Sequence, residues 1–154
     1  MTDFLTSLNR AALNDDPASS RERDNIDSNV TIVVCRSCLF PDQRGGNQPE
    51  IETRPGYLLA QATIEAAAAT GIAVRQAGCL GNCSRGVSAA VLRRGCWSYL
   101  FGELGIDSAT DLIAGAKLFA ASTDGFMPFR ARPEALKQGL IARIPSFENL
   151  KDLP

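Results

Sequence analysis

The residues most able to do chemistry in this sequence are cysteines. Four of them form two close pairs: the first cysteine pair, Cys35 and Cys38, stands in "CRSC", and the second cysteine pair, Cys79 and Cys83, stands in "CLGNC". The chain contains no histidine, so a Ser-His-Asp triad, a zinc hydrolase site with a histidine ligand and a Rieske cluster each lack a required residue. The chemistry open to the two pairs is that of thiols and thiolates.

Three kinds of thiol site fit this pattern. Four thiolates at one point make a soft, all-sulfur site, which suits zinc or an iron–sulfur cluster and does not suit magnesium or calcium. "CRSC" alone also matches the C-x-x-C dithiol of redox proteins. A redox dithiol accounts for only two of the four paired cysteines. In addition, "LFPDQRGG" after Cys38 does not begin the helix that lowers a thiol pKa in such proteins. A metal site is therefore favoured over a redox dithiol.

Zinc and an iron–sulfur cluster both remain open. Closed four-cysteine zinc sites are common, but zinc ribbons are small folds that need the metal, and this chain has enough apolar helix and strand to build its own core. The second loop contains Gly78, Gly81 and Gly86, which let backbone N–H groups turn toward sulfur and so favour a negatively charged cluster. Arg36 and Arg85 either add positive potential beside the ligands or are solvated loop charges.

Each cysteine pair begins where a predicted strand ends. "NVTIVVC" is a β-branched run that ends on Cys35, and "IAVRQAGC" is a second short strand that ends on Cys79. Between them, Pro55 fits the first turn of a helix over "GYLLAQATIEAAAAT", and Gly71 ends that helix. The order strand, helix, strand predicts a parallel pair, whose carboxyl ends lie side by side. We therefore expect the two cysteine pairs to converge on one point.

The rest of the chain completes an α/β order. "VSAAVLRRGCWSYLFGEL" predicts a hairpin with its turn at residues 93–95. Ser108 precedes a helix over "ATDLIAGAKLFAAST", and Gly125 closes it. The order β-α-β-β-β-α is that of the thioredoxin-like core, here a mixed four-stranded sheet with two main helices. The tail beyond it is predicted to be irregular, with at most one short helix begun by Pro133.

Composition limits the organisation and the partners of the protein. We expect residues 1–28 to be a flexible leader, residues 29–125 a thioredoxin-like domain, and residues 126–154 a C-terminal extension that packs on this domain. The net charge of -1 and the pI near 5.5 argue against a nucleic-acid-binding surface.

The pattern of apolar residues bears on location. The longest apolar runs are interrupted by Gln61, Glu65 and Lys117, so we expect no membrane span. The amino terminus lacks the apolar run of a secretory signal, so we expect a cytoplasmic protein. A reducing compartment disfavours structural disulfides, which leaves clustered thiols for metal binding or redox work.

The fifth cysteine, Cys96, stands beside an aromatic strand in "RGCWSYLFG". We interpret it as a small buried hydrophobic residue rather than a fifth ligand. Trp97, Tyr99 and Phe101 alternate, so they line one face of their strand. That face either packs in the core or under the tail, or forms the surface of a homodimer.

A cysteine pair after the first strand, and C-x-x-x-C in a glycine-rich loop after the second, resemble the thioredoxin-like [2Fe-2S] ferredoxins. That family includes the small ferredoxin-like subunit of NADH dehydrogenases. More narrowly, "GCLGNCSRG" followed by "GCWSYLFG" is similar to an uncharacterised bacterial family of predicted metal-binding proteins. The resemblance covers roughly residues 30 to 145, including "DGFMPFRARPEALKQGLIARIP".

This resemblance implies an electron carrier, not an enzyme by itself, whose [2Fe-2S] cluster is bound by Cys35, Cys38, Cys79 and Cys83. It implies a redox partner protein, with no role for nucleic acid or membrane. Bacterial relatives of the narrower family often stand near cobalamin genes, so the resemblance implies service in cobalamin or related metabolism. The first pair is more widely spaced in the better known ferredoxins, so it stays open which cysteines share an iron. The alternative is a zinc-stabilised binding module with a four-cysteine site.

Overall fold

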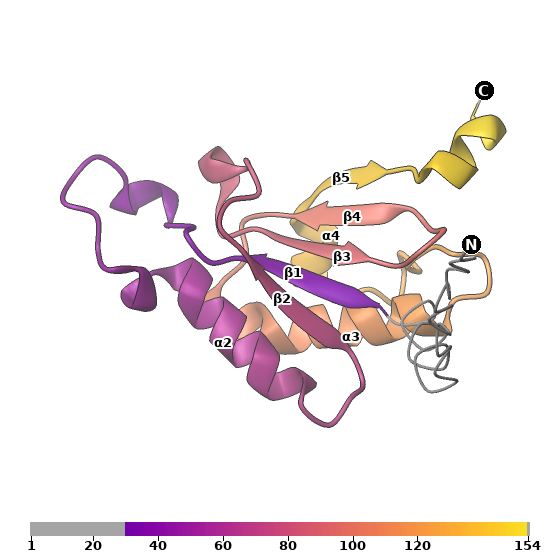
Figure 1. The fold of residues 1–154 in the computed structure, drawn as a ribbon, viewed down its shortest axis with the longest axis horizontal. Coiled ribbons are helices and arrows are strands. Elements are labelled where there is room, and N and C mark those ends of the chain that lie inside the picture. The colour runs from indigo at the N-terminus through magenta and orange to yellow at the C-terminus, as the bar shows by residue number, and fades with distance from the viewer. Residues whose placement is uncertain (1–29, 154) are drawn as a thin grey trace, which may run out of the picture.

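The computed structural model describes residues 30–153, and within this range the chain forms a five-stranded mixed sheet (Figure 1). The strand order across the sheet is β2-β1-β3-β4-β5. β1 and β2 are parallel, and every other neighbouring pair is antiparallel. The strands are β1 (Thr31–Cys35), β2 (Ala73–Ala77), β3 (Ala89–Leu92), β4 (Ser98–Phe101) and β5 (Leu140–Ile144).

Two long helices, α2 (Pro55–Ala67) and α3 (Ala109–Ala121), lie side by side on one face of the sheet (Figure 1). α2 begins at Pro55, whose missing N–H costs nothing in the first turn of a helix. The chain turns into β2 at Gly71, which has a φ of 72° that few other residues adopt. Both helices contact β1, the strand of the parallel pair that lies inside the sheet.

The core lies between the sheet and these two helices. Ile32 and Val34 on β1 are fully buried, while Val33 between them is half-buried, as the period of a strand requires. Leu59 of α2 and Leu112 of α3 are also fully buried and belong to the same apolar cluster. Most of this core therefore comes from regular elements that the alternation of apolar residues marks in the sequence.

The structure confirms the predicted α/β class and the predicted order of strands and helices up to α3. It corrects the strand count: within the described residues the sheet has five strands, not four. The tail is not irregular, because α4 (Glu134–Gln138) follows Pro133 and leads into β5, which pairs with β4. "LIARI" is a short strand that pairs only with the edge of β4. Its strand structure therefore comes from this pairing, and its own sequence does not predict it.

Other expectations need smaller changes. α3 ends at Ala121 with Ser122 as its C-cap, so Gly125 lies beyond the helix end. The Ser108 hydroxyl accepts a hydrogen bond from the Gly105 N–H and does not cap the helix. The expected flexible leader, residues 1–28, lies outside the described residues. Among residues 30–153, no helix combines the length and the apolar character needed to cross a bilayer.

Candidate metal centre

The first cysteine pair lies at the carboxyl end of β1. Cys35 is the last residue of the strand, and its N–H donates to the Ser88 carbonyl at 3.0 Å. The next N–H, of Arg36, donates to the Ala77 carbonyl at the end of β2, also at 3.0 Å. Hydrogen bonds to the segments on both sides of β1 thus fix the position at which the chain leaves the sheet. Cys35 is 1% exposed and Cys38 is 5% exposed, so both thiols of this pair are buried.

The second cysteine pair lies in the loop after β2, and both of its residues are exposed. Gly81 has a φ of 75°, and its N–H points at the Cys79 sulfur, 3.3 Å away. The Sγ atoms of Cys79 and Cys83 are 4.0 Å apart. Two sulfurs on one tetrahedral metal, each about 2.3 Å from it, lie about 3.8 Å apart. This pair is therefore spaced for a single metal ion.

The two loops are joined to each other. The Ser37 hydroxyl donates to the Gly78 carbonyl, and the Cys35 Sγ lies 3.9 Å from the same oxygen. Cys38 and Cys83 line one cavity of about 250 Å³. The structure therefore brings members of both pairs to one cavity, at the end of the sheet where the parallel strands finish.

Backbone and hydroxyl groups surround the first pair and shift its pKa values. A hydrogen bond with Cys38 lowers the pKa of Cys35 to about 5, aided by the Leu80 and Ser37 N–H groups and opposed by burial. The same bond, together with burial, raises the pKa of Cys38, while hydrogen bonds from Ser88 oppose that shift. Negative charge on the first pair is thus met by donors from both loops.

The pKa of Cys83 is raised, first by its hydrogen bond with Cys79 and then by the Cys79 charge. The guanidinium of Arg44 acts in the opposite direction, and the charge of Cys35 adds to the rise. Because Cys35 belongs to the other pair, the two pairs share one electrostatic environment.

The donor set fits a soft metal or cluster, because it consists of sulfur and is arranged as two close pairs. Across the described residues, no group of three or more Cys, Asp or Glu side chains is close enough to hold a single metal ion. The four predicted ligands are therefore gathered as two pairs beside one cavity and not as one compact set. A two-iron cluster takes two protein ligands on each iron.

One of the two basic side chains that the sequence suggested is paired with a carboxylate, and two further arginines lie at the site. Arg85 pairs with Glu103, with an N···O distance of 2.9 Å, so its charge is compensated. Arg44 and Arg54 line the cavity instead, and Arg54 also donates to the Ser37 carbonyl at 3.4 Å. Both arginines stand in the segment that follows "CRSC", and this nearness is the only sequence signal that could have indicated them.

The amino terminus of α2 lies against the first cysteine pair. The Gly56 N–H donates to the Cys38 carbonyl at 3.1 Å. A Cβ at Gly56 would overlap the Cys35 carbonyl oxygen and come within 2.9 Å of the Cys38 nitrogen. "CRSC" does not continue into a helix, as expected, but a helix that begins later in the chain still points its positive end at this loop.

The fifth cysteine is separate from this site. Cys96 lies in the β3–β4 turn, where it is half-buried and packs against the core. On the strand that follows, Tyr99 and Phe101 are buried with their rings stacked 6.2 Å apart, and Trp97 contacts Phe126 of the C-terminal segment. The alternating aromatic residues therefore serve packing in the core and under the tail.

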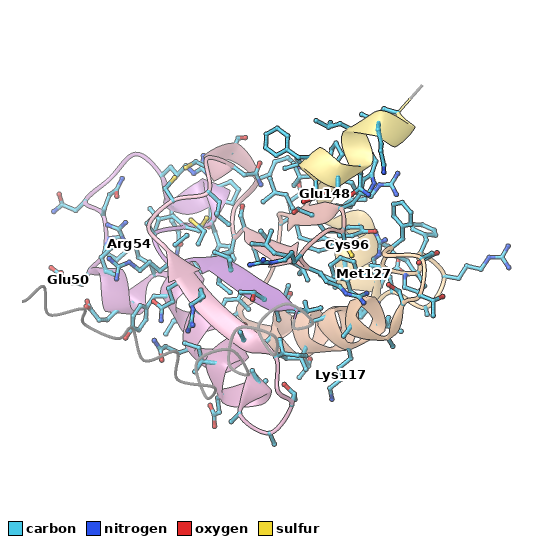
Figure 2. All side chains as sticks on the ribbon, turned by 45° about the vertical axis from the view of Figure 1, so that its right-hand side comes forward. Glu50, Arg54, Cys96, Lys117, Met127 and Glu148 are labelled. Atoms are coloured by element: carbon cyan, nitrogen blue, oxygen red, sulfur yellow. The ribbon has the colours of Figure 1, made fainter. Side chains whose placement is uncertain are left out.

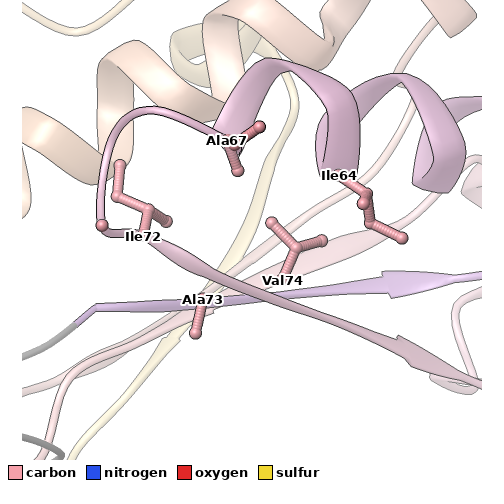
Figure 3. A pocket seen from close by; sticks show the side chains of 7 residues that line it. Ile64, Ala67, Ile72, Ala73 and Val74 are labelled. Carbon is pink, nitrogen blue, oxygen red and sulfur yellow. The ribbon is translucent and has the colours of Figure 1, made fainter.

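Another cavity, of about 350 Å³, lies between the end of α2 and the start of β2 (Figure 3). Its walls are aliphatic, with Ile64, Ala67, Ile72 and Val74 among them. It lies at the opposite end of β2 from the second cysteine pair, and none of its lining residues is ionisable. It offers no chemistry to the candidate site.

Comparison with known proteins identifies the family of the chain and several similar structures. Two structures of a thioredoxin-like [2Fe-2S] ferredoxin from Aquifex aeolicus are similar to this chain, each at 15% identity. The first has a TM-score of 0.49 and covers 75% of this chain and 92% of its own, and the second has 0.48, 74% and 97%. No curated protein matches the chain. The family model described as "Protein of unknown function (DUF1636)" matches residues 32–146, most of the chain, and the protein therefore belongs to that family.

Proposed function

We propose that the protein is an electron carrier that binds a [2Fe-2S] cluster through Cys35, Cys38, Cys79 and Cys83. The observation that carries this proposal is the arrangement of four thiols as two close pairs on two joined loops, with Cys38 and Cys83 lining the same cavity. Each pair would hold one iron. The sequence resemblance to thioredoxin-like [2Fe-2S] ferredoxins points to the same group.

A bound cluster would accept and return single electrons. The chain's own residues would hold it and tune its potential, because hydrogen bonds to sulfur and burial both change the cost of adding negative charge. The donors directed at cysteine sulfur include the N–H groups of Gly81, Leu80 and Ser37 and the hydroxyl of Ser88. Arg44 and Arg54 add positive charge beside them.

The proposed carrier needs a redox partner protein and catalyses no substrate reaction alone. The first cysteine pair is buried and the second is exposed, so the partner would approach from the loop that holds Cys79 and Cys83. Service in cobalamin or related metabolism rests on the sequence resemblance alone.

A zinc-stabilised binding module is the second candidate. The 4.0 Å separation of the Cys79 and Cys83 sulfurs suits one tetrahedral zinc as well as one iron. Anaerobic purification, a visible absorption spectrum, and iron, sulfide and zinc analysis separate the two candidates. We expect a coloured protein with iron and sulfide in equal amounts. A colourless protein with zinc and no sulfide would overturn the electron-carrier proposal.

Two serine variants test the ligand set. Cys83→Ser should lose most of its iron and sulfide, because it removes one of two ligands to an iron. Cys96→Ser is the matched control. It should retain iron and sulfide in full, because Cys96 lies in the β3–β4 turn and not in either loop that holds a cysteine pair. Full retention of iron by Cys83→Ser would remove the four-cysteine site.

A further inference from the structure

A cavity of about 470 Å³ lies between the segment after α3 and the edge strand β5. Met127, which lines it, and Arg54, which lines the metal-site cavity, stand on opposite sides of the molecule in Figure 2. The proposed electron-carrier function makes no use of this cavity. Its walls combine aromatic rings with two guanidinium groups, those of Arg132 and Arg143.

Arg132 is buried, and no acidic side chain among residues 30–153 pairs with it, which is unusual for an arginine. Only 5% of it is exposed, and its Nη2 donates to the Met127 carbonyl at 2.8 Å. Its Nε and Nη1 are buried and have no hydrogen-bond partner among the described residues. The Tyr99 ring lies 5.2 Å from the guanidinium and stabilises its charge, but the two buried donors are costly unless an acceptor meets them, so they call for an acceptor from outside the described residues.

A second positive charge faces the same space. The Arg143 guanidinium lies on the rings of Trp97 and Phe126, 5.4 Å and 5.8 Å from their centres, and has no acidic partner among the described residues. Burial lowers the pKa of Arg132, interaction with Tyr99 opposes that shift, and the like charge of Arg143, a smaller cause, adds to it. The one carboxylate of the lining, Asp124, already accepts the Phe126 N–H at 3.0 Å. The lining therefore carries net positive charge.

The rest of the lining indicates what the anion is attached to. Phe129 is 62% exposed, and its ring lies 5.6 Å from the Arg132 guanidinium. Phe126, Met127 and Leu140 add further apolar surface. The cavity volume falls in the range of small-molecule sites, well above the size of an inorganic anion.

We propose that this cavity binds a small organic oxyanion, a carboxylate or a phosphate monoester carried by a flat apolar group. The oxyanion would pair with the exposed Arg143 guanidinium and, with the Phe129 side chain shifted, accept hydrogen bonds from the free Arg132 donors, which would offset the repulsion between the two arginines. The apolar group would stack on the exposed Phe129 ring and displace water from the aliphatic wall.

Calorimetric titration of the full-length protein with benzoate and with phenyl phosphate tests this site and separates the two headgroups. We expect at least one of them to bind. Benzamide, which has the same ring without the charge, and acetate, which has the charge without the ring, should each bind about tenfold more weakly or worse. Trp97 is the only tryptophan in the chain and lies under Arg143, so its fluorescence should change on binding.

Arg143→Gln is the test variant, because Arg143 is exposed and its loss should leave the fold intact. It should weaken binding about tenfold. Arg130→Gln is the matched control: it removes the same charge from an exposed residue of the neighbouring loop outside the cavity lining, and it should bind as the wild type does. The proposal is overturned if neither aromatic anion binds, if benzamide binds as well as benzoate, or if Arg143→Gln binds as well as the wild type.

Discussion

Gly56 occupies a position where a side chain does not fit. Alanine normally stabilises a helix relative to glycine, but here a Cβ would collide with the backbone of the first cysteine pair. We expect Gly56→Ala to lower the free energy of unfolding by about 2 kcal/mol and to reduce the iron content of the purified protein. Urea unfolding and iron analysis measure both effects.

The control for this variant is Gly46→Ala, because a Cβ added at Gly46 would meet no atom within 4 Å and the residue has no positive φ. Its free energy of unfolding should stay within about 0.5 kcal/mol of the wild type. Equal iron content and stability in the two variants would show that α2 does not press against the cysteine loop.

The Arg85–Glu103 pair makes stability depend on pH. Hydrogen bonding to Arg85, and next its charge, lowers the pKa of Glu103 below its ordinary value of 4.5. A carboxylate whose pKa is lowered on folding contributes stability above its unfolded pKa and loses it as the pH falls through the folded value. Glu103→Gln should therefore be less stable than the wild type at neutral pH, and the difference should shrink in acid.

Urea unfolding of both proteins at about pH 7 and about pH 3.5 measures this difference. The pair is exposed, so the effect should be small and should fall with added salt. A difference that is the same at both pH values would mean that the glutamine variant loses packing and not charge.

Single residues also mark the limit of what the sequence reveals about the site. The four cysteines could be found because spacing alone relates them to known ligand patterns, and Gly81 because it stands between two of them. Gly56 and Ser88 could not be found. Gly56 touches the first cysteine pair only once α2 has packed against the loop, and Ser88 touches it only once β3 has paired with β1. Contacts of this kind depend on tertiary structure and leave no local pattern.

Among the elements, β4 pairs with β5 and is also tied to the segment after α3 through one hydroxyl. The Met127 N–H donates to the Tyr99 hydroxyl oxygen at 2.9 Å, and both residues are buried. Tyr99→Phe leaves that N–H without an acceptor and should lower the free energy of unfolding by about 1–2 kcal/mol in urea. The other tyrosine, Tyr57, is half-buried on α2, and Tyr57→Phe should change stability by less than about 0.5 kcal/mol. Equal stability of the two variants would contradict a structural role for the hydroxyl.

The elements differ in how far they could be predicted. β1 and α2 carry their own signals, because a β-branched run and a proline-led alanine-rich segment each favour one structure locally. β5 has no such signal. It is a strand because β4 offers an open edge and α4 turns the chain back toward it, and both conditions exist only in the folded molecule.

For the whole molecule, the core and the candidate metal centre are largely separate. Most of the buried apolar cluster lies away from the centre, and only Cys35 and Cys38 among its buried members belong to both. We therefore expect the metal-free protein to keep its far-UV circular dichroism spectrum and a cooperative urea transition, at reduced stability. Loss of the spectrum on metal removal would indicate a fold that depends on its metal, as in zinc ribbons.

The unequal burial of the two cysteine pairs sets the order in which the site would be damaged. In the metal-free chain an oxidant meets the exposed thiols of Cys79 and Cys83 first, while the sheet and α2 shield the other two. Early oxidation is then confined to one surface loop, where a reductant can reach it and restore the thiols. The closeness of the Cys79 and Cys83 sulfurs favours a disulfide as the first product, which a thiol reductant reverses before either sulfur reaches the irreversible sulfinic acid.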